Sequence, residues 1–293
     1  MSSQPMISII MTVKNNGIDL FMAMESLKVS QTSIPYELIL VNEGSVDGCC
    51  DFLMNYHFPR PFRLLKGQTG VPSRNLGAAH AFGTYLIFCT PRLYFEDHWM
   101  EALLAPILEG EAEAVSPRME IHESSRFAPE LRYDGELLRS MEQYPWRTED
   151  EALAWLSPEC FAISREKFKE IGGVEEGFIG KGLETSELSL RTWLLGGRCR
   201  LVSETALMIV YRQNFPIDDR ARQWGNDLLR LAELHFREDR ITACRDLVAR
   251  VFGTEAMKQS EEIARTAAFS RDKYETRRLR DDSWFFGHFG IPV

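Results

Sequence analysis

The sequence predicts an α/β fold in which a mostly parallel central sheet carries helices on both faces. Three observations predict it. Short, largely apolar runs such as Ile7–Val13 are typical of strands that are buried on both faces. Segments with apolar residues at helical spacing alternate with these runs, which is the pattern of parallel strands joined by helices. Polar loops rich in Asn, Asp and Gly separate the two kinds of segment.

The predicted elements begin with the strand at residues 7–13. Asp19 can cap the helix that follows, and Pro35 ends it. Further strands are predicted at residues 36–41, 62–65, 84–89, 160–164, 199–202 and 207–211. Further helices are predicted at residues 49–55, 70–82, 165–171, 186–195 and 255–280. The polar stretch 117–158 loses this alternation, and we expect it to form long loops or short helices.

The length of 293 residues predicts one large domain with an appendage. We expect the sheet domain to span residues 1–215 and a helical extension to span residues 216–293. The extension ends in an aromatic cluster at 284–289, which is very apolar for a free tail. We expect this tail to dock on its own chain or on a partner, or to close over the active site. A homo-oligomer formed through the C-terminal helices is therefore possible.

The composition excludes several function classes. The chain has 34 Lys and Arg against 43 Asp and Glu, a net charge of −9, so nonspecific nucleic-acid binding is not expected. No stretch is apolar enough for a transmembrane segment, and the first residues lack the pattern of a signal peptide. The six cysteines lack C-x-x-C spacing, so we expect reduced thiols and a cytoplasmic protein.

Five segments carry a family resemblance. ISIIMTVKNN, ELILVNEGSVDG and GVPSRNLGAAHAFGTYLIF resemble the nucleotide-binding half of GT-A-fold, family-2-type glycosyltransferases. CFAISREKFKEIGGVEE and GLETSELSLRTWLLGGRCRLVSETALMIVYR are similar to later segments of that family, the second of them to polypeptide N-acetylgalactosaminyltransferases. The resemblance covers residues 6 to 236 in order. It implies a Rossmann-like GT-A domain that binds a nucleotide-sugar.

The resemblance assigns nucleotide-binding roles. Glu43 matches the acid that hydrogen-bonds uracil, and Thr12 and Lys14 match positions that flank the base and ribose. Arg74 and Asn75 match a pair that helps to build the nucleotide pocket, where Arg74 could contact the diphosphate. Two alternatives stay open. Glu43 could be a turn residue without a ligand, and Arg74 could pair with the acidic loop at 42–47.

The resemblance fails at the metal site. The family's Asp-x-Asp, whose carboxylates help to hold Mn²⁺ or Mg²⁺, is matched by Thr90-Pro91-Arg92. A late-strand histidine of the family is matched by Ile209. We therefore expect no divalent metal and no other cofactor, unless Mn²⁺ or Mg²⁺ binds at a site rebuilt from other residues. Thr90 and Arg92 remain candidate nucleotide-binding residues, with Arg92 neutralising the leaving diphosphate.

The position of the family's catalytic base is also altered. Inverting members have an Asp there, a retaining subgroup has Asn, and this chain has Thr185, which has no useful pKa. Glu184 and Glu187 remain as candidate catalytic residues that could bind acceptor hydroxyls or act as base. The alternative is that both are acids favoured at a helix start by the helix dipole.

The leading hypothesis is a metal-independent glycosyltransferase that uses a UDP-linked sugar. Its acceptor could be a glycan, a peptide or a small molecule, and retaining or inverting chemistry stays open. The alternative is a catalytically degenerate relative that binds a nucleotide, sugar or protein partner. A purely structural interaction protein is the third hypothesis, and detectable UDP binding would count against it.

Overall fold

The computed structural model describes residues 5–121, 148–210 and 217–291, which form two compact units. The first unit contains the described residues within Met1–Ala128, Leu156–Glu176 and Arg200–Gln213. The second contains those within Pro129–Trp155, Gly177–Cys199 and Asn214–Val293.

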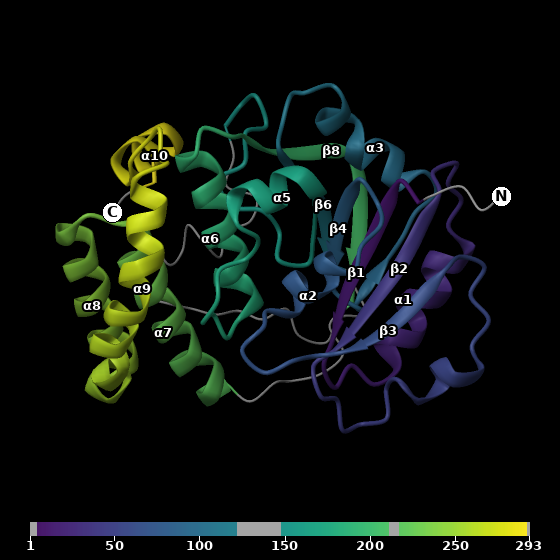
Figure 1. Cartoon of the computed structure of the whole chain (residues 1–293), viewed down its shortest axis with the longest axis horizontal. Helices are drawn as coiled ribbons and strands as arrows, with labels where there is room; N and C mark the ends of the chain where they lie inside the picture. Colours follow the sequence, from purple (N-terminus) through teal and green to yellow (C-terminus); the bar gives the residue numbers. More distant parts are fainter. Residues whose placement is uncertain (1–4, 122–147, 211–216, 292–293) are drawn as a thin grey trace. The chain divides into compact units, whose positions relative to one another are not determined.

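The described strands form an eight-stranded sheet in the order β3-β2-β1-β4-β7-β6-β8-β5 (Figure 1). They are β1 Ile7–Val13, β2 Tyr36–Asn42, β3 Phe62–Lys66, β4 Tyr85–Cys89, β5 Leu93–Tyr94, β6 Ala114–Ile121, β7 Cys160–Ser164 and β8 Cys199–Ile209. Strands β3, β2, β1 and β4 pair in parallel, whereas β4–β7, β6–β7 and β5–β8 are antiparallel. Because β7 runs against β4, its first residues lie at the edge where β1, β2 and β4 end.

Both faces of this sheet are covered within the first unit. The helical segments are α1 Ile18–Val29, η1 Asp51–Asn55, α2 Ser73–Ala79, α3 Trp99–Leu108 and α5 Arg165–Ile171. Residues of β1 at odd positions cluster with buried residues of α1 and α3. On the opposite face, α2 packs so closely that a Cβ added at Gly77 would lie 2.4 Å from Cγ2 of Ile10. On the same face, the ring centres of Phe168 in α5 and Phe88 in β4 are 5.0 Å apart. The two faces therefore follow the period of two that strands impose, and the predicted α/β fold class is confirmed.

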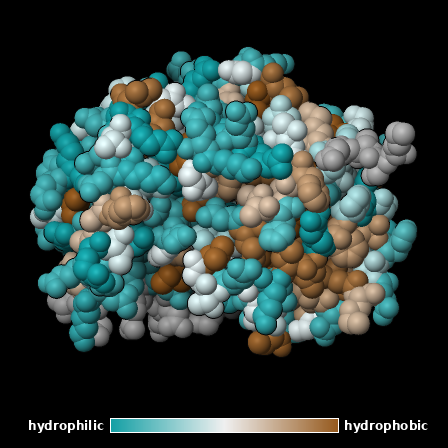
Figure 2. All heavy atoms as spheres, viewed as in Figure 1, coloured by the Kyte–Doolittle hydropathy of each residue, from teal (hydrophilic) through white to brown (hydrophobic). Residues whose placement is uncertain are grey.

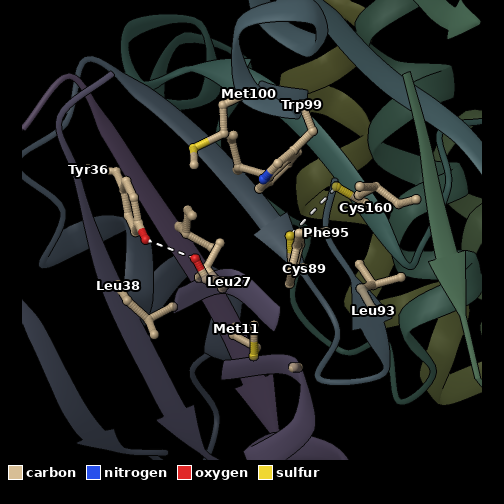
Figure 3. Close-up of a cluster of buried hydrophobic side chains, with 14 of the residues drawn as sticks. Met11, Leu27, Tyr36, Leu38, Cys89, Leu93, Phe95, Trp99, Met100 and Cys160 are labelled. Carbon is tan, nitrogen blue, oxygen red and sulfur yellow. Dashed lines mark hydrogen bonds between the residues drawn. The ribbon is translucent and has the colours of Figure 1, made fainter. Parts of the chain in front are cut away.

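Figure 3 shows the core on the α1 and α3 face. Trp99 and Met100 from α3 and Leu27 from α1 are buried with Met11 and Leu38 of the sheet. Side chains of this size contribute roughly 1.5–3 kcal/mol each when fully buried. This packing holds the parallel strands, and so the loops that leave them, in fixed positions.

The second unit is helical among its described residues. Its segments are α6 Lys181–Leu194, α7 Ile217–His235, α8 Glu238–Phe252, η2 Thr254–Gln259, α9 Ser260–Glu275 and α10 Asp282–Phe289. α7 packs against α6, α8 and α9, and the last two lie to its left in Figure 1. The aromatic tail forms α10. Its Phe285 ring centre lies 4.9 Å from that of Trp155, and its Phe289 ring centre lies 5.3 Å from that of Trp193. The tail therefore docks on its own chain.

Several elements differ from the sequence predictions. The strands expected at 199–202 and 207–211 are one strand, β8, and the helix expected at 255–280 is split into η2 and α9. Strand β6 and helix α3 were not expected. Helix α6 begins at Lys181 rather than 186, and it groups with the C-terminal helices rather than with the sheet domain expected at 1–215. Residues 122–147 of the stretch expected to form loops or short helices lie outside the described residues.

Figure 2 shows hydrophilic residues over much of the face drawn, with hydrophobic residues between them. None of the helices within 5–121, 148–210 and 217–291 has the length and hydrophobicity of a membrane-spanning segment.

Candidate functional site

The loops that follow β1 and β2 are tied together at the carboxyl edge of the parallel strands. The N–H of Asn15 donates to Oγ of Ser45 over 3.1 Å, and the N–H of Gly17 donates to Oδ2 of Asp47 over 2.8 Å. Gly17 has a φ of 52°, a left-handed conformation that favours glycine. These bonds hold the two loops that carry the predicted base and ribose contacts side by side.

Three predicted nucleotide-binding residues lie at these strand ends. Thr12 is buried near the end of β1, and Lys14 is exposed directly after it. Glu43 is half-buried after β2, and its N–H donates to the carbonyl of Val13 over 2.8 Å. The structure therefore brings Thr12, Lys14 and Glu43 to adjoining positions, from which they could contact one ligand.

The next predicted pair, Arg74 and Asn75, lies in the first turn of α2. Nη2 of Arg74 donates to the carbonyl of Pro158 over 2.8 Å, and its guanidinium lies 5.1 Å from the ring centre of Phe161. The amide of Asn75 donates to the carbonyl of Val174 and accepts from the N–H of Val174, both over 2.9 Å. Asn75 thus fastens the loop after α5 to α2, whereas Arg74 supports the segment that enters β7.

The positions matching the family's metal ligands lie close together. The chain passes from Thr90 and Arg92 into β5, where Leu93 pairs with Ile209, and the carbonyl of Arg92 accepts from the N–H of Val210 over 3.1 Å. A hydroxyl, a guanidinium and a buried alkyl group do not fit a divalent cation that prefers carboxylate oxygens. Within the described parts of the chain, no group of three or more His, Cys, Asp and Glu could hold a metal ion.

An acid that the sequence analysis missed lies beside Thr90. The hydroxyl of Thr90 donates to the carboxylate of Glu159, and the N–H of Thr90 donates to the carbonyl of Glu159 over 3.0 Å. Cys89 and Cys160, the neighbouring residues, pair across β4 and β7. Glu159 therefore stands at the amino end of β7, at the same edge as the predicted nucleotide-binding loops. The sequence signal that could have identified Glu159 is a carboxylate directly before the apolar run at 160–164.

Glu187, one of the two predicted catalytic acids, is wholly buried in the second unit. Its Oε2 accepts from Nη2 of Arg191 over 2.8 Å, and its Oε1 lies 2.7 Å from Nε2 of His235. Burial by itself raises the pKa of the Glu187 carboxyl, but the charge of Arg191 and the hydrogen bond of His235 outweigh it and lower the pKa. Both oxygens are therefore held by buried partners, an arrangement that favours a structural role.

The other predicted catalytic acid, Glu184, lies in the first turn of α6 close to a second buried acid, Asp227 of α7. The two carboxylate oxygens of Asp227 accept the N–H groups of Ile179 and Gly180 over 2.9 and 2.7 Å. Burial raises the pKa of Asp227 to about 7, and the charge of Glu184 also raises it, against the hydrogen bonds and the charge of Arg230. Asp227 therefore fixes the residues that enter α6.

This raised pKa predicts a pH dependence of stability. The folded chain keeps the Asp227 proton up to a pH of about 7, whereas the unfolded chain loses it near the ordinary pKa of 3.8. The Asp227 contribution is thus fully present below pH 3.8 and is lost as the pH rises to about 7, by up to about 1.4 kcal/mol per pH unit. Between pH 5 and pH 8, the natural chain should therefore lose free energy of unfolding relative to Asp227→Asn. Urea unfolding of both chains at each pH measures this difference. A constant difference would contradict this.

The predicted site residues fall in different units. Glu184 and Glu187 belong to the second unit. The predicted nucleotide-binding residues all belong to the first, and they are Thr12, Lys14, Glu43, Arg74, Asn75, Thr90 and Arg92. The sheet edge of the first unit is therefore the candidate nucleotide site.

Comparisons with known proteins bear on the family and the fold. Residues 8–172 match the sequence profile of glycosyl transferase family 2. Polypeptide N-acetylgalactosaminyltransferase 8 of Drosophila melanogaster is 30% identical over 219 residues, which are 68% of this chain and 37% of that protein. The "putative inactive polypeptide N-acetylgalactosaminyltransferase 11" of the same organism is 28% identical over 205 residues, 64% of this chain and 36% of that protein.

The chain spans little more than a third of the length of these curated relatives. Among solved structures, that of GalNAc-T7 with UDP, GalNAc and Mn²⁺ superposes with a TM-score of 0.70 at 18% identity. The superposition covers 100% of this chain and 59% of the other. At this identity the likeness concerns the fold, which is the GT-A fold.

Proposed function

The chain belongs to glycosyl transferase family 2, whose profile matches more than half of its length, and we propose that it transfers a sugar from a UDP-linked donor to an acceptor hydroxyl. The observation that carries this proposal is the sheet edge of the first unit. There Glu43 follows β2, Lys14 follows β1, and Thr90 and Arg92 follow β4. Ligands of open α/β sheets bind beyond such strand ends.

The chemistry that the edge must supply is the stabilisation of negative charge. Cleavage of the bond between sugar and phosphate leaves that charge on the departing UDP. The GalNAc-T7 structure contains Mn²⁺, whereas this chain has a threonine and an arginine in place of the two carboxylates. We assign the cation's role to Arg92, with Lys14 as a second positive group, and the transfer then needs no metal site of the family's kind.

Calorimetric titration of UDP tests both parts of this proposal. The titration is made on the whole chain with EDTA, and again with Mn²⁺. UDP should bind in EDTA, and Mn²⁺ should not raise the affinity. A complete absence of UDP binding would reject the nucleotide-sugar function, whereas binding that requires Mn²⁺ would reject only metal independence.

Replacement of Arg92 by alanine should weaken UDP binding about tenfold to a hundredfold, because a charge-assisted hydrogen bond to a phosphate is lost. Calorimetry in EDTA measures the change. Arg60→Ala is the matched control, because Arg60 is an exposed arginine at the opposite end of the sheet, before β3. Equal affinities of Arg92→Ala and Arg60→Ala would remove Arg92 from the site.

The resemblance keeps Glu184, whose side chain is buried in the second unit, as the candidate for the acceptor base or for binding acceptor hydroxyls. Glu184→Gln should then abolish transfer with little change in UDP affinity, which separates chemistry from donor binding.

A catalytically degenerate binding protein is the second candidate function. The altered metal and base positions favour it, and one relative bears the name "putative inactive" transferase. Incubation of the purified chain with UDP-sugars separates the two candidates, because release of free UDP, by hydrolysis or transfer, occurs only if the protein is an enzyme.

A further inference from the structure

The sheet order arranges the candidate ligand residues in a line. From β2 through β1 and β4 to β7, the edge presents Glu43, then Lys14, then Thr90, and last Glu159. Neighbouring strands lie about 4.8 Å apart, so β2 and β7 are about 14 Å apart. A nucleotide-sugar whose base lies at Glu43 and whose diphosphate lies at Thr90 places its sugar at the next strand, which begins after Glu159.

The position of Glu159 is fixed from several directions. Its carbonyl accepts from the N–H of Thr90 over 3.0 Å, and its N–H donates to Oγ of Ser157 over 3.2 Å. Its carboxylate accepts the hydroxyl of Thr90, and the side chain is half-buried. Arg74 donates to the carbonyl of Pro158, the preceding residue, over 2.8 Å. The carboxylate is therefore held at the edge by a residue that is itself only partly buried.

The chemistry of a carboxylate decides which part of the ligand it suits. An anion repels a diphosphate when no metal lies between them. A carboxylate accepts hydrogen bonds strongly, and its two oxygens can accept from two neighbouring sugar hydroxyls. Burial in the edge strengthens such bonds relative to bulk water.

We propose that Glu159 binds hydroxyl groups of the donor sugar and thereby selects which UDP-sugar the protein accepts. This inference rests on the proposed nucleotide-sugar function. It adds a sugar-binding residue beyond the positions that match the family's motifs. Thr90 orients the Glu159 carboxylate rather than holding a metal.

The test compares UDP with UDP-glucose, UDP-galactose, UDP-N-acetylglucosamine and UDP-N-acetylgalactosamine. Affinities are measured by calorimetry in EDTA for the natural chain, for Glu159→Gln and for Glu159→Ala. The control is Glu166→Gln, because Glu166 is an exposed acid after β7, at the opposite edge of the sheet. Glu159→Gln keeps the size of the side chain and one acceptor oxygen, and its thermal unfolding shows whether the fold is kept.

In the natural chain we expect one UDP-sugar to bind more tightly than UDP. Glu159→Ala should reduce that advantage about tenfold or more, and Glu159→Gln should reduce it by less. UDP itself should bind both variants as tightly as the natural chain or more tightly, because a negative charge near the diphosphate is removed. Glu166→Gln should change neither affinity.

Three outcomes would overturn the inference. The first is that the Glu159 variants lose affinity for UDP and for the UDP-sugar equally. The second is that the UDP-sugar still binds these variants more tightly than UDP does, by the same factor as in the natural chain. Mn²⁺-dependent binding that Glu159→Gln abolishes would instead make Glu159 a metal ligand. If the natural chain binds no UDP at all, the proposed function fails first, and this inference fails with it.

Discussion

Replacing Arg191 by methionine should lower the free energy of unfolding by about 3–5 kcal/mol, because it leaves a buried carboxylate without its cation. Arg191 and Glu187 are both fully buried, one helical turn apart on α6. Arg191 also donates from Nη1 to the hydroxyl of Tyr274 on α9 over 2.8 Å. His235 of α7 completes the cluster at Oε1 of Glu187. Three helices of the second unit thus meet at one ion pair, so urea unfolding of the whole chain should report the loss.

The double variant Glu187→Gln/Arg191→Met separates this explanation from a loss of packing. Removal of both charges should make it less destabilised than Arg191→Met alone, while the introduced glutamine retains an acceptor for His235. The control is Arg265→Met, because the ion pair of Arg265 with Glu262 is exposed and its loss should change the free energy of unfolding little. If the two substitutions are simply additive, the buried charge is not the cause.

The role of this ion pair also explains why the sequence was ambiguous about Glu187. An acid near the start of a helix, beside the position of a family base, suits either catalysis or structure. The partner that decides between them is His235, 48 positions further along the chain. No local pattern specifies that contact, because it depends on how α6 and α7 pack. Asp227 was missed for the same reason, since it caps residues 179–180 from another helix.

The parallel half of the sheet could be predicted because each strand there is a short buried run between polar loops. β6, Ala114–Ile121, lacks that signal. Only Ala114 and Val115 pair with β7, and polar residues and Pro117 follow them, so its strand conformation depends on the neighbouring strand. The same limit applies to Glu159. Residues 160–164 were predicted to form a strand, but the direction in which it joins the sheet decides which end meets the site.

A second large loss of stability is expected when Glu37 of β2 is replaced by leucine. Its side chain is buried, and its Oε1 accepts the hydroxyl of Ser8 and the N–H of Phe82, both over 2.7 Å. Oε2 accepts from Nη2 of Arg63 over 2.7 Å. The carboxylate therefore links β1, β2, β3 and the turn that enters β4. Leucine would remove the acceptor of the buried Ser8 hydroxyl and of the partly buried N–H of Phe82, and we expect a cost of about 3–5 kcal/mol in urea unfolding.

Two further substitutions distinguish the hydrogen bonds from Ser8 and Phe82 from the ion pair with Arg63. Glu37→Gln keeps an oxygen that can accept from Ser8 and Phe82, so it should cost less than Glu37→Leu. Arg63→Ala should cost less than Glu37→Leu, because the side chain of Arg63 is 34% exposed, so water can replace part of its contact, and the donors of Ser8 and Phe82 keep their acceptor. If Arg63→Ala matched Glu37→Leu, the ion pair and not the hydrogen bonds from Ser8 and Phe82 would hold the strands together. Because β1, β2 and β4 carry the loops of the proposed nucleotide site, a chain destabilised at Glu37 should also lose UDP binding as it unfolds, whereas Arg63→Ala should retain it.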